Sequence, residues 1–101
     1  MIPLLEENRE KIAEICRNHH VRRLSVFGSA VRDDFDPERS DVDFLVEFSH
    51  EGRRGLRNYF SFSDSLSALL ARPVGLVSEG TIRNEYLQQS IDEDRRLIYA
   101  A

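Results

Sequence analysis

Two aspartates separated by a single valine, Asp41 and Asp43, are the residues in this sequence best placed to do chemistry. On a β-strand, side chains at positions i and i+2 point to the same face, with their Cα atoms roughly 6.5–7 Å apart. Carboxylates at that spacing repel each other, and Mg²⁺ compensates them well because it takes one or two carboxylates together with phosphate oxygens. The pattern therefore predicts a divalent-cation site. The alternative is that Asp41 ends a turn and Asp43 faces water.

A glycine–serine turn, Gly28-Ser29, follows the predicted strand residues 24–27, and eleven residues separate it from Asp41. Glycine lets the backbone approach a ligand closely, and backbone amides at the start of a helix favour phosphate oxygens. Serine adds a hydroxyl donor. A Gly-Ser pair alone is usually an ordinary turn. Combined with the two aspartates on a second strand, it predicts a turn that cradles a triphosphate beside carboxylates that hold its metal.

Hydrophobic periodicity predicts the elements that must position these residues. Apolar residues at helical spacing predict three helices, over residues 4–19, 56–70 and 81–94, with Thr81 capping the last. Four strands are predicted over residues 21–27, 41–48, 72–77 and 96–99. In the second strand, Val42, Phe44, Val46 and Phe48 share one face. The middle helix is predicted to direct seven side chains inward: Leu56, Tyr59, Phe60, Ser63, Leu66, Leu69 and Leu70.

The order of these elements predicts the fold class. Helix, strand, strand, helix, strand, helix and strand follow one another in a chain of 101 residues, which is the length of one domain. Hydrophobic residues make up 41% and charged residues 32%, an ordinary globular mixture. We therefore expect an α/β (α+β) fold over residues 1–101: a single small domain in which helices pack on a mixed β-sheet of about four strands.

Charge and composition exclude several classes of partner. Lys and Arg number 14 against 18 Asp and Glu, which gives a net charge of −4, and the stretch 33–51 is strongly acidic. Because no basic stripe could release counterions, we expect no nucleic-acid polymer as a partner. We also expect no membrane span, because no apolar run approaches 18 residues, and no signal peptide. Cys16 is the only cysteine, so an intrachain disulfide is excluded and a reducing, cytoplasmic location is predicted.

The motifs together resemble the minimal nucleotidyltransferase (MNT) family of the DNA polymerase β superfamily, which includes the MntA-like antitoxin partners of HEPN toxins. The matching stretches are 24–32 (LSVFGSAVR), 39–46 (RSDVDFLV) and 73–77 (PVGLV), and the resemblance extends over nearly the whole chain. It implies the polymerase-β-type nucleotidyltransferase fold. It also implies transfer of a nucleoside monophosphate, AMP from ATP or its equivalent from another nucleoside triphosphate, to a hydroxyl such as a tyrosine of a small helical HEPN-domain toxin.

The resemblance also implies roles for individual residues. Asp41 and Asp43 would be the catalytic carboxylates and the ligands of Mg²⁺, or of Mn²⁺ in its place. Gly28 and Ser29 would bind the nucleotide phosphates. Arg32 matches a family arginine after the Gly-Ser turn and would be a third phosphate contact, although an exposed or loop-bracing arginine is an equal alternative.

One position departs from the family pattern. The third strand of the family carries Val-Asp-Leu-Val, whereas this sequence has Val74-Gly75-Leu76-Val77. The third aspartate serves the ion that activates the hydroxyl, and losing a positioned base typically costs a factor of about 10²–10⁴ in rate. Glu47 and Glu79 are poor replacements because each lies too far along its strand. The alternative function is therefore a catalytically impaired antitoxin that neutralises a helical HEPN toxin by direct binding.

Overall fold

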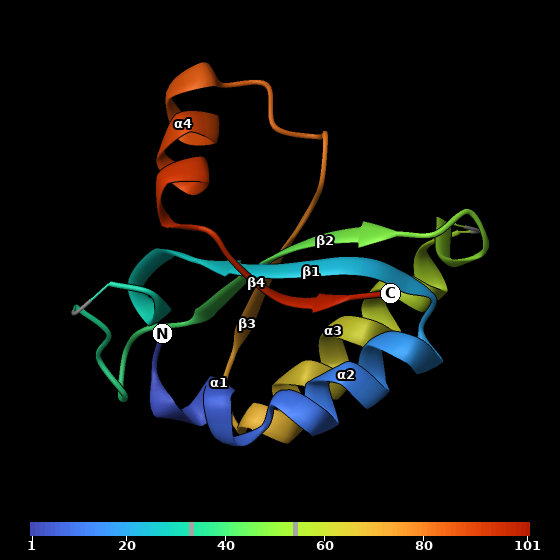
Figure 1. The fold of residues 1–101 in the computed structure, drawn as a ribbon, viewed down its shortest axis with the longest axis horizontal. Coiled ribbons are helices and arrows are strands. Elements are labelled where there is room, and N and C mark those ends of the chain that lie inside the picture. The colour runs from blue at the N-terminus through green and yellow to red at the C-terminus, as the bar shows by residue number, and fades with distance from the viewer. Residues whose placement is uncertain (33, 54) are drawn as a thin grey trace.

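Four strands form one mixed sheet. The computed structural model describes residues 1–32, 34–53 and 55–101. The strands are β1 (Val21–Phe27), β2 (Val42–Phe48), β3 (Val74–Ser78) and β4 (Arg96–Ala100), in the order β3-β2-β1-β4. β1 is antiparallel to β2 and β4, whereas β2 and β3 are parallel (Figure 1). The predicted mixed sheet of four strands is confirmed.

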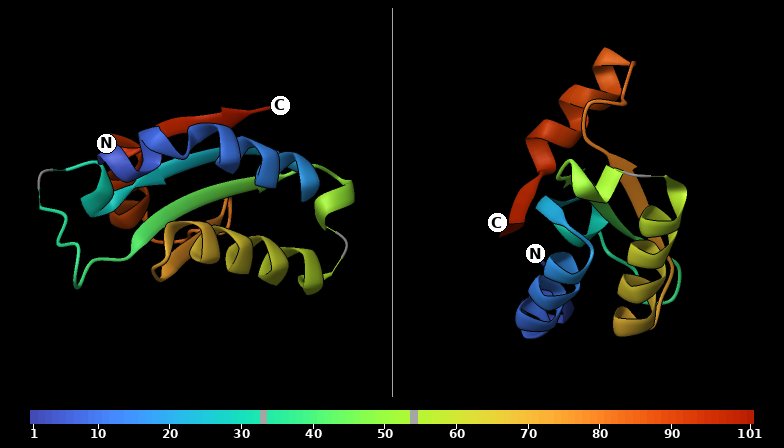
Figure 2. Two further views of the ribbon diagram at one scale, coloured as in Figure 1. Left: turned by 90° about the horizontal axis from the view of Figure 1, so that it is seen from below. Right: turned by 90° about the vertical axis from the view of Figure 1, so that its right-hand side faces the viewer.

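Three of the helices cover one face of this sheet. α1 (Pro3–Glu7), α2 (Arg9–Asn18) and α3 (Leu56–Leu70) lie on the same side of the strands, which is the side that faces the viewer in the left panel of Figure 2. α3 also provides the crossover that a parallel pair such as β2 and β3 requires. α4 (Glu85–Asp94) lies on the opposite side (Figure 1). Two short 3₁₀ turns, η1 (Gly28–Ala30) and η2 (Glu51–Arg53), complete the described elements.

The hydrophobic core lies between the sheet and the covering helices. The alternation predicted for the second strand is confirmed, because its four core-facing side chains are at most 7% exposed: Val42, Phe44, Val46 and Phe48. Leu24 and Val26 of β1 join the same cluster. The intervening residues of both strands, among them Ser25 and Asp43, therefore belong to the other face of the sheet.

The predicted helix boundaries differ from the observed ones in two places. The first predicted helix is divided at Asn8, which ends α1 and whose side-chain amide donates to the carbonyl of Leu4 (2.9 Å). The last helix begins at Glu85 rather than at residue 81, because Asn84 is the capping residue and its Oδ1 accepts from the backbone amides of Tyr86 and Leu87. None of the helices in the described ranges is long and apolar enough to cross a membrane.

The inward face of α3 also differs from the prediction. Phe62, Leu66 and Leu70 form the buried row, at 0–2% exposure. Leu56 and Phe60, which were expected to point inward, are 69% and 56% exposed. A helix rotates by about 100° per residue, so burying Phe62 turns Phe60 nearly to the opposite side. The prediction for Leu56 and Phe60 was therefore wrong.

Candidate active site

Asp43 lies where the end of β1 meets the start of β3. In the sheet register it is paired with Phe27 of β1 on one side and with Gly75 of β3 on the other. Gly28-Ser29 follows Phe27 directly, so the register brings the turn to the neighbourhood of this carboxylate. Asp41 lies one residue before β2 and is exposed, whereas Asp43 is half-buried.

The Gly-Ser turn lies beside the carboxylate of Asp43. The φ angle of Gly28 is +78°, a conformation that side chains rarely adopt, and the backbone amides of Val31 and Arg32 donate to the Gly28 carbonyl. A Cβ atom at Gly28 would lie 2.9 Å from Oδ2 of Asp43. The turn therefore needs glycine for its conformation and for the close approach of the aspartate. Ser29 is half-buried on the same turn.

The carboxylate of Asp43 also occupies the space beside Gly75. A Cβ atom at Gly75 would lie 2.5 Å from Oδ1 of Asp43, closer than two non-bonded atoms can approach. Any larger residue at position 75 therefore requires the Asp43 carboxylate to rotate away. The register confirms that position 75 is the neighbour of Asp43 on the parallel strand. A side chain there would share the site with Asp43, and glycine leaves that place without a carboxylate.

The charges around Asp43 show which groups lie near it. Partial burial raises the pKa of the Asp43 carboxyl above its ordinary value, the carboxylate of Asp41 raises this pKa further, and the cation of Arg32 lowers it. Within the described ranges, no group of three or more His, Cys, Asp or Glu side chains is arranged to hold a metal ion. Asp41 and Asp43 are the two carboxylates that could hold one hard cation here, and such a cation would take its remaining ligands from phosphate oxygens and water.

Arg32 is held by two carboxylates in this structure. Its Nη1 donates to Oδ2 of Asp94 at 2.6 Å, and its Nε donates to Oδ1 of Asp34 at 3.3 Å. Asp94 is the last residue of α4, so the pair connects α4 to the segment that follows the Gly-Ser turn. This arrangement matches the loop-bracing alternative for Arg32. Asp94 was not predicted as a partner of Arg32, because no sequence pattern relates two residues that are 62 positions apart.

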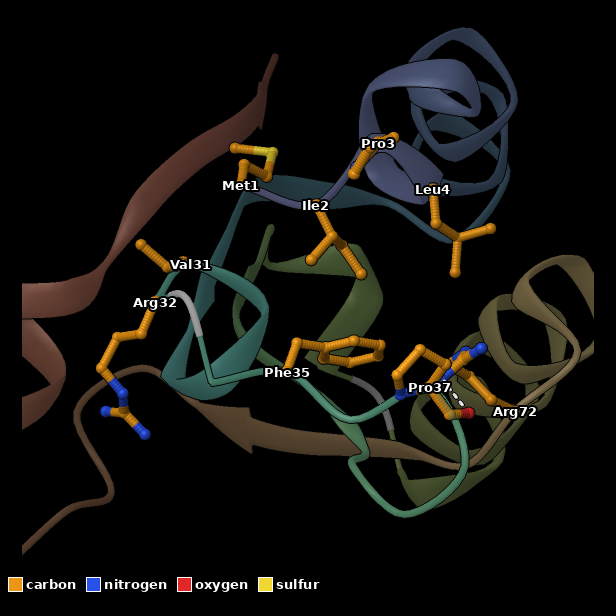
Figure 3. A pocket seen from close by; sticks show the side chains of 9 residues that line it. All are labelled: Met1, Ile2, Pro3, Leu4, Val31, Arg32, Phe35, Pro37 and Arg72. Carbon is orange, nitrogen blue, oxygen red and sulfur yellow. Dashed lines mark hydrogen bonds between the residues drawn. The ribbon is translucent and has the colours of Figure 1, made fainter.

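The loop between the turn and the aspartates is anchored beside a pocket of about 500 Å³. Figure 3 shows Ile2 and Phe35 directed towards the same space, whereas Arg32 points away from it. The guanidinium of Arg72 lies 5.0 Å from the ring centre of Phe35, and its Nη1 donates to the carbonyl of Pro37 (3.1 Å). These contacts hold the loop against the start of β3. The pocket is separate from the carboxylate pair, because neither Asp41 nor Asp43 lines it.

The two carboxylates that the sequence offers as replacements for the missing aspartate are engaged elsewhere. Glu47 accepts from Nε of Arg23 at 3.2 Å, and Glu79 accepts from Nη2 of Arg95 at 2.8 Å. Both pairs lie farther along the sheet than Asp43. The structure thus agrees with the expectation that neither glutamate replaces an aspartate at position 75.

The sequence matches a known protein family and a related archaeal protein. The family model described as "Nucleotidyltransferase domain" matches residues 9–98. The chain belongs to this family. A nucleotidyltransferase domain implies, in general terms, a nucleoside triphosphate substrate and a divalent metal ion. The chain is also 40% identical over 97 residues to a protein of Methanocaldococcus jannaschii named "Putative protein adenylyltransferase MJ0128", with 88% of this chain and 94% of the relative covered.

Solved structures share the fold of this nucleotidyltransferase domain. One, described as a "putative minimal nucleotidyltransferase", is 29% identical, with a TM-score of 0.74 and coverage of 91% of this chain and 90% of its own. Another comes from the complex of a tri-AMPylated HEPN toxin of Shewanella oneidensis with its MNT antitoxin. It has a TM-score of 0.67 and 17% identity, and the match covers 96% of this chain and 73% of that one. The second likeness concerns the fold alone.

Proposed function

We propose that this domain binds a nucleoside triphosphate, ATP in the first instance, at the Gly28-Ser29 turn and the Asp41–Asp43 pair. The observation that carries the proposal is that the carboxylate of Asp43 lies so close to Gly28 that a Cβ atom there would be 2.9 Å from its Oδ2. A turn whose backbone a ligand can approach closely therefore lies next to two mutually repelling carboxylates, which a cation would stabilise. Ser29 would donate its hydroxyl to a phosphate oxygen, and Asp41 and Asp43 would hold Mg²⁺ or Mn²⁺.

The bound cation would neutralise phosphate charge and lower the pKa of an attacking hydroxyl. The protein itself would position the phosphates through the turn, with Asp41 close enough to Asp43 to raise the pKa of its carboxyl. Asp43 is fixed by its neighbours on β1 and β3, whereas Asp41 is free to adjust because it precedes the strand. Arg32 lies close enough to influence Asp43 but is engaged by Asp94, so it acts first as a brace for the turn.

The reaction we propose is transfer of AMP to a hydroxyl of a protein, such as a tyrosine of a small helical HEPN toxin in the cytoplasm, so that the domain acts as its antitoxin. Support comes from the adenylyltransferase name of the M. jannaschii relative and from the shared fold of the MNT antitoxin. The missing carboxylate at Gly75 makes us expect slow transfer, because a positioned base typically contributes a factor of about 10²–10⁴.

A second function is favoured by the same glycine. If transfer is too slow to matter, the domain would neutralise the toxin by direct contact while still holding nucleotide. The proposed nucleotide ligands, which are the turn and the carboxylate pair, do not include a side chain at position 75, so nucleotide binding would survive with glycine there.

Calorimetric titration with Mg-ATP, run beside a transfer assay with α-labelled ATP and a co-expressed helical partner, tests the proposal. We expect binding that requires Mg²⁺, together with slow labelling of the partner. Rapid transfer by the unmodified protein would contradict our interpretation of Gly75. Absence of Mg-ATP binding would contradict the proposed site itself.

A further inference from the structure

A hollow of about 450 Å³ lies on the sheet face opposite the core. Ser25, Leu45 and Leu97 line it and form one row across the sheet, because Ser25 is paired with Leu45 of β2 and with Leu97 of β4. Phe27, Asp43 and Gly75 form the next row on the same face. Adjacent rows on one face are separated by two residues, or roughly 6.5–7 Å. Neither aspartate lines the hollow, but it lies one row along the same sheet face from Asp43.

The charged groups of the hollow neutralise one another. Arg23 and Arg95 line it together with Glu47 and Glu79, and the two arginines contact the two glutamates at 3.2 and 2.8 Å. A lining with two positive and two negative groups offers no excess of positive charge to a triphosphate. It suits a polypeptide, whose backbone and side chains supply hydrogen-bonding groups of both kinds.

Of the two leucines that line the hollow, only Leu97 offers exposed apolar surface. Leu45 is only 2% exposed and Leu97 is 53% exposed, so an apolar ligand could bury the side chain of Leu97 further. Ser25 is a polar residue within the same row. An apolar ring that carries a hydroxyl at its tip matches this combination, because the ring can lie on Leu97 while the hydroxyl stays among polar groups. The volume is in the range of small-ligand pockets and accommodates one aromatic side chain with adjoining backbone.

We propose that this hollow is the acceptor site, which receives the tyrosine-bearing segment of the protein that is modified. The inference rests on the proposed function and adds to it the place of the second substrate. In the reaction, the phenolic oxygen forms a bond to the α-phosphorus of ATP, and the bond from that phosphorus to the bridging oxygen breaks. Pyrophosphate leaves with its bonding electrons. The phenolic proton passes to water, because position 75 supplies no carboxylate to accept it.

Disulfide tethering in the full-length chain tests the hollow without an identified partner. Leu97→Cys places a thiol at the hollow, and Leu56→Cys is the matched control, because Leu56 is 69% exposed on α3 at the covered side of the sheet. The native thiol of Cys16 will not interfere, since it is buried and burial raises its pKa to about 12. The probes are a disulfide reagent with a 4-hydroxyphenethyl group and the same reagent without the hydroxyl.

Capture is measured by mass spectrometry in the presence of a competing thiol, and AMP addition is measured after incubation with Mg-ATP. We expect capture of the phenol at position 97 to exceed capture at position 56 at least about threefold. We also expect AMP addition at position 97 to be at least about tenfold faster, because tethering raises the effective concentration of the hydroxyl. The reagent without the hydroxyl should be captured but never gain AMP.

The outcomes separate the inference from the proposed function. Preferential capture at position 97 without AMP addition would still support the hollow as the acceptor site and would locate the defect in the chemistry. Equal capture at both positions, with Mg-ATP binding intact by calorimetry, would overturn the acceptor site and leave the nucleotide site standing. Failure of the wild-type chain to bind Mg-ATP would overturn both.

Discussion

Among single residues, Asp43 is the one on which the candidate site depends most. Its carboxylate occupies the space next to two glycines, Gly28 just after β1 and Gly75 on β3. Among the residues of the site, Asp43 alone is paired with both β1 and β3. Both glycines leave room for the same side chain. The sequence marks Asp43 by its spacing from Asp41, but its position between the two glycines becomes visible only in the register of the sheet.

Asp43→Asn is expected to lower the affinity for Mg-ATP at least about 10-fold, since even losing an outer-shell partner of a metal typically costs 10–100-fold. The free energy of unfolding without metal should not fall, because burial and Asp41 already disfavour the charged form of Asp43. Calorimetry and urea denaturation measure the two quantities. Glu38→Gln, in the same acidic stretch but exposed, is the matched control and should leave both unchanged. Unaltered Mg-ATP affinity in Asp43→Asn would remove this carboxylate from the site.

Gly75→Asp is expected to raise the rate of AMP transfer about 10-fold or more by restoring a carboxylate, provided that the side chain of Asp43 rotates to admit it. Gly75→Asn is the matched control, because it makes the same steric demand without supplying a base. The labelled-ATP transfer assay compares the three proteins. If neither variant gains activity while Mg-ATP binding is intact, the neutralising function is favoured over catalysis.

Among the helices and strands, those whose apolar and polar residues fall clearly on two different faces were predicted best from the sequence. β2 was predictable because apolar residues stand at every second position of it, with Asp43 and Glu47 on the other face, and a period of two leaves one orientation in which the apolar side is buried. Leu45 is the one apolar residue on that other face. α3 was predictable as a helix, but its orientation was not. Three aromatic residues, Tyr59, Phe60 and Phe62, compete for the inward face, and only packing against the sheet selects Phe62.

Substitutions in α3 test this orientation. Phe62→Ala is expected to lower the free energy of unfolding by about 3–5 kcal/mol, because it removes a fully buried ring from the core. Phe60→Ala should cost less than about 1 kcal/mol, since Phe60 is mostly exposed and its ring contact is with Tyr59. Urea denaturation of both variants makes the comparison. Equal losses would mean that the helix is rotated relative to the structure.

Boundaries and long-range pairs were less predictable from local sequence. Thr81 and Asn84 are both good helix caps, and the hydroxyl of Thr81 instead donates to the carbonyl of Ser78 (2.7 Å). The ion pair between Arg32 and Asp94 joins residues that no sequence pattern relates. The acceptor hollow likewise depends on the strand register that aligns Ser25 with Leu45 and Leu97. Such features arise from topology, which a linear pattern does not contain.

At the scale of the whole molecule, the net charge of −4 and the acidic stretch around the carboxylate pair oppose binding to polyanions. We expect single-stranded DNA to be bound no more tightly than about 10⁻⁴ M at physiological salt, the weak end of non-specific association. Fluorescence anisotropy with a labelled oligonucleotide measures this, with and without Mg²⁺. Micromolar affinity that weakens steeply with salt would contradict the prediction and favour a nucleic-acid substrate.

NMR with Mn²⁺ locates the metal-bound nucleotide on the protein and therefore tests the proposed site. Mn²⁺ is paramagnetic and broadens the amide signals nearest to it. With ATP present, we expect the amide signals of Gly28, Asp43 and Gly75 to broaden first, and we expect Asp43→Asn to abolish this effect. Earlier broadening at the exposed acidic pair Asp92-Glu93 of α4, or uniform broadening over the chain, would contradict the proposed site.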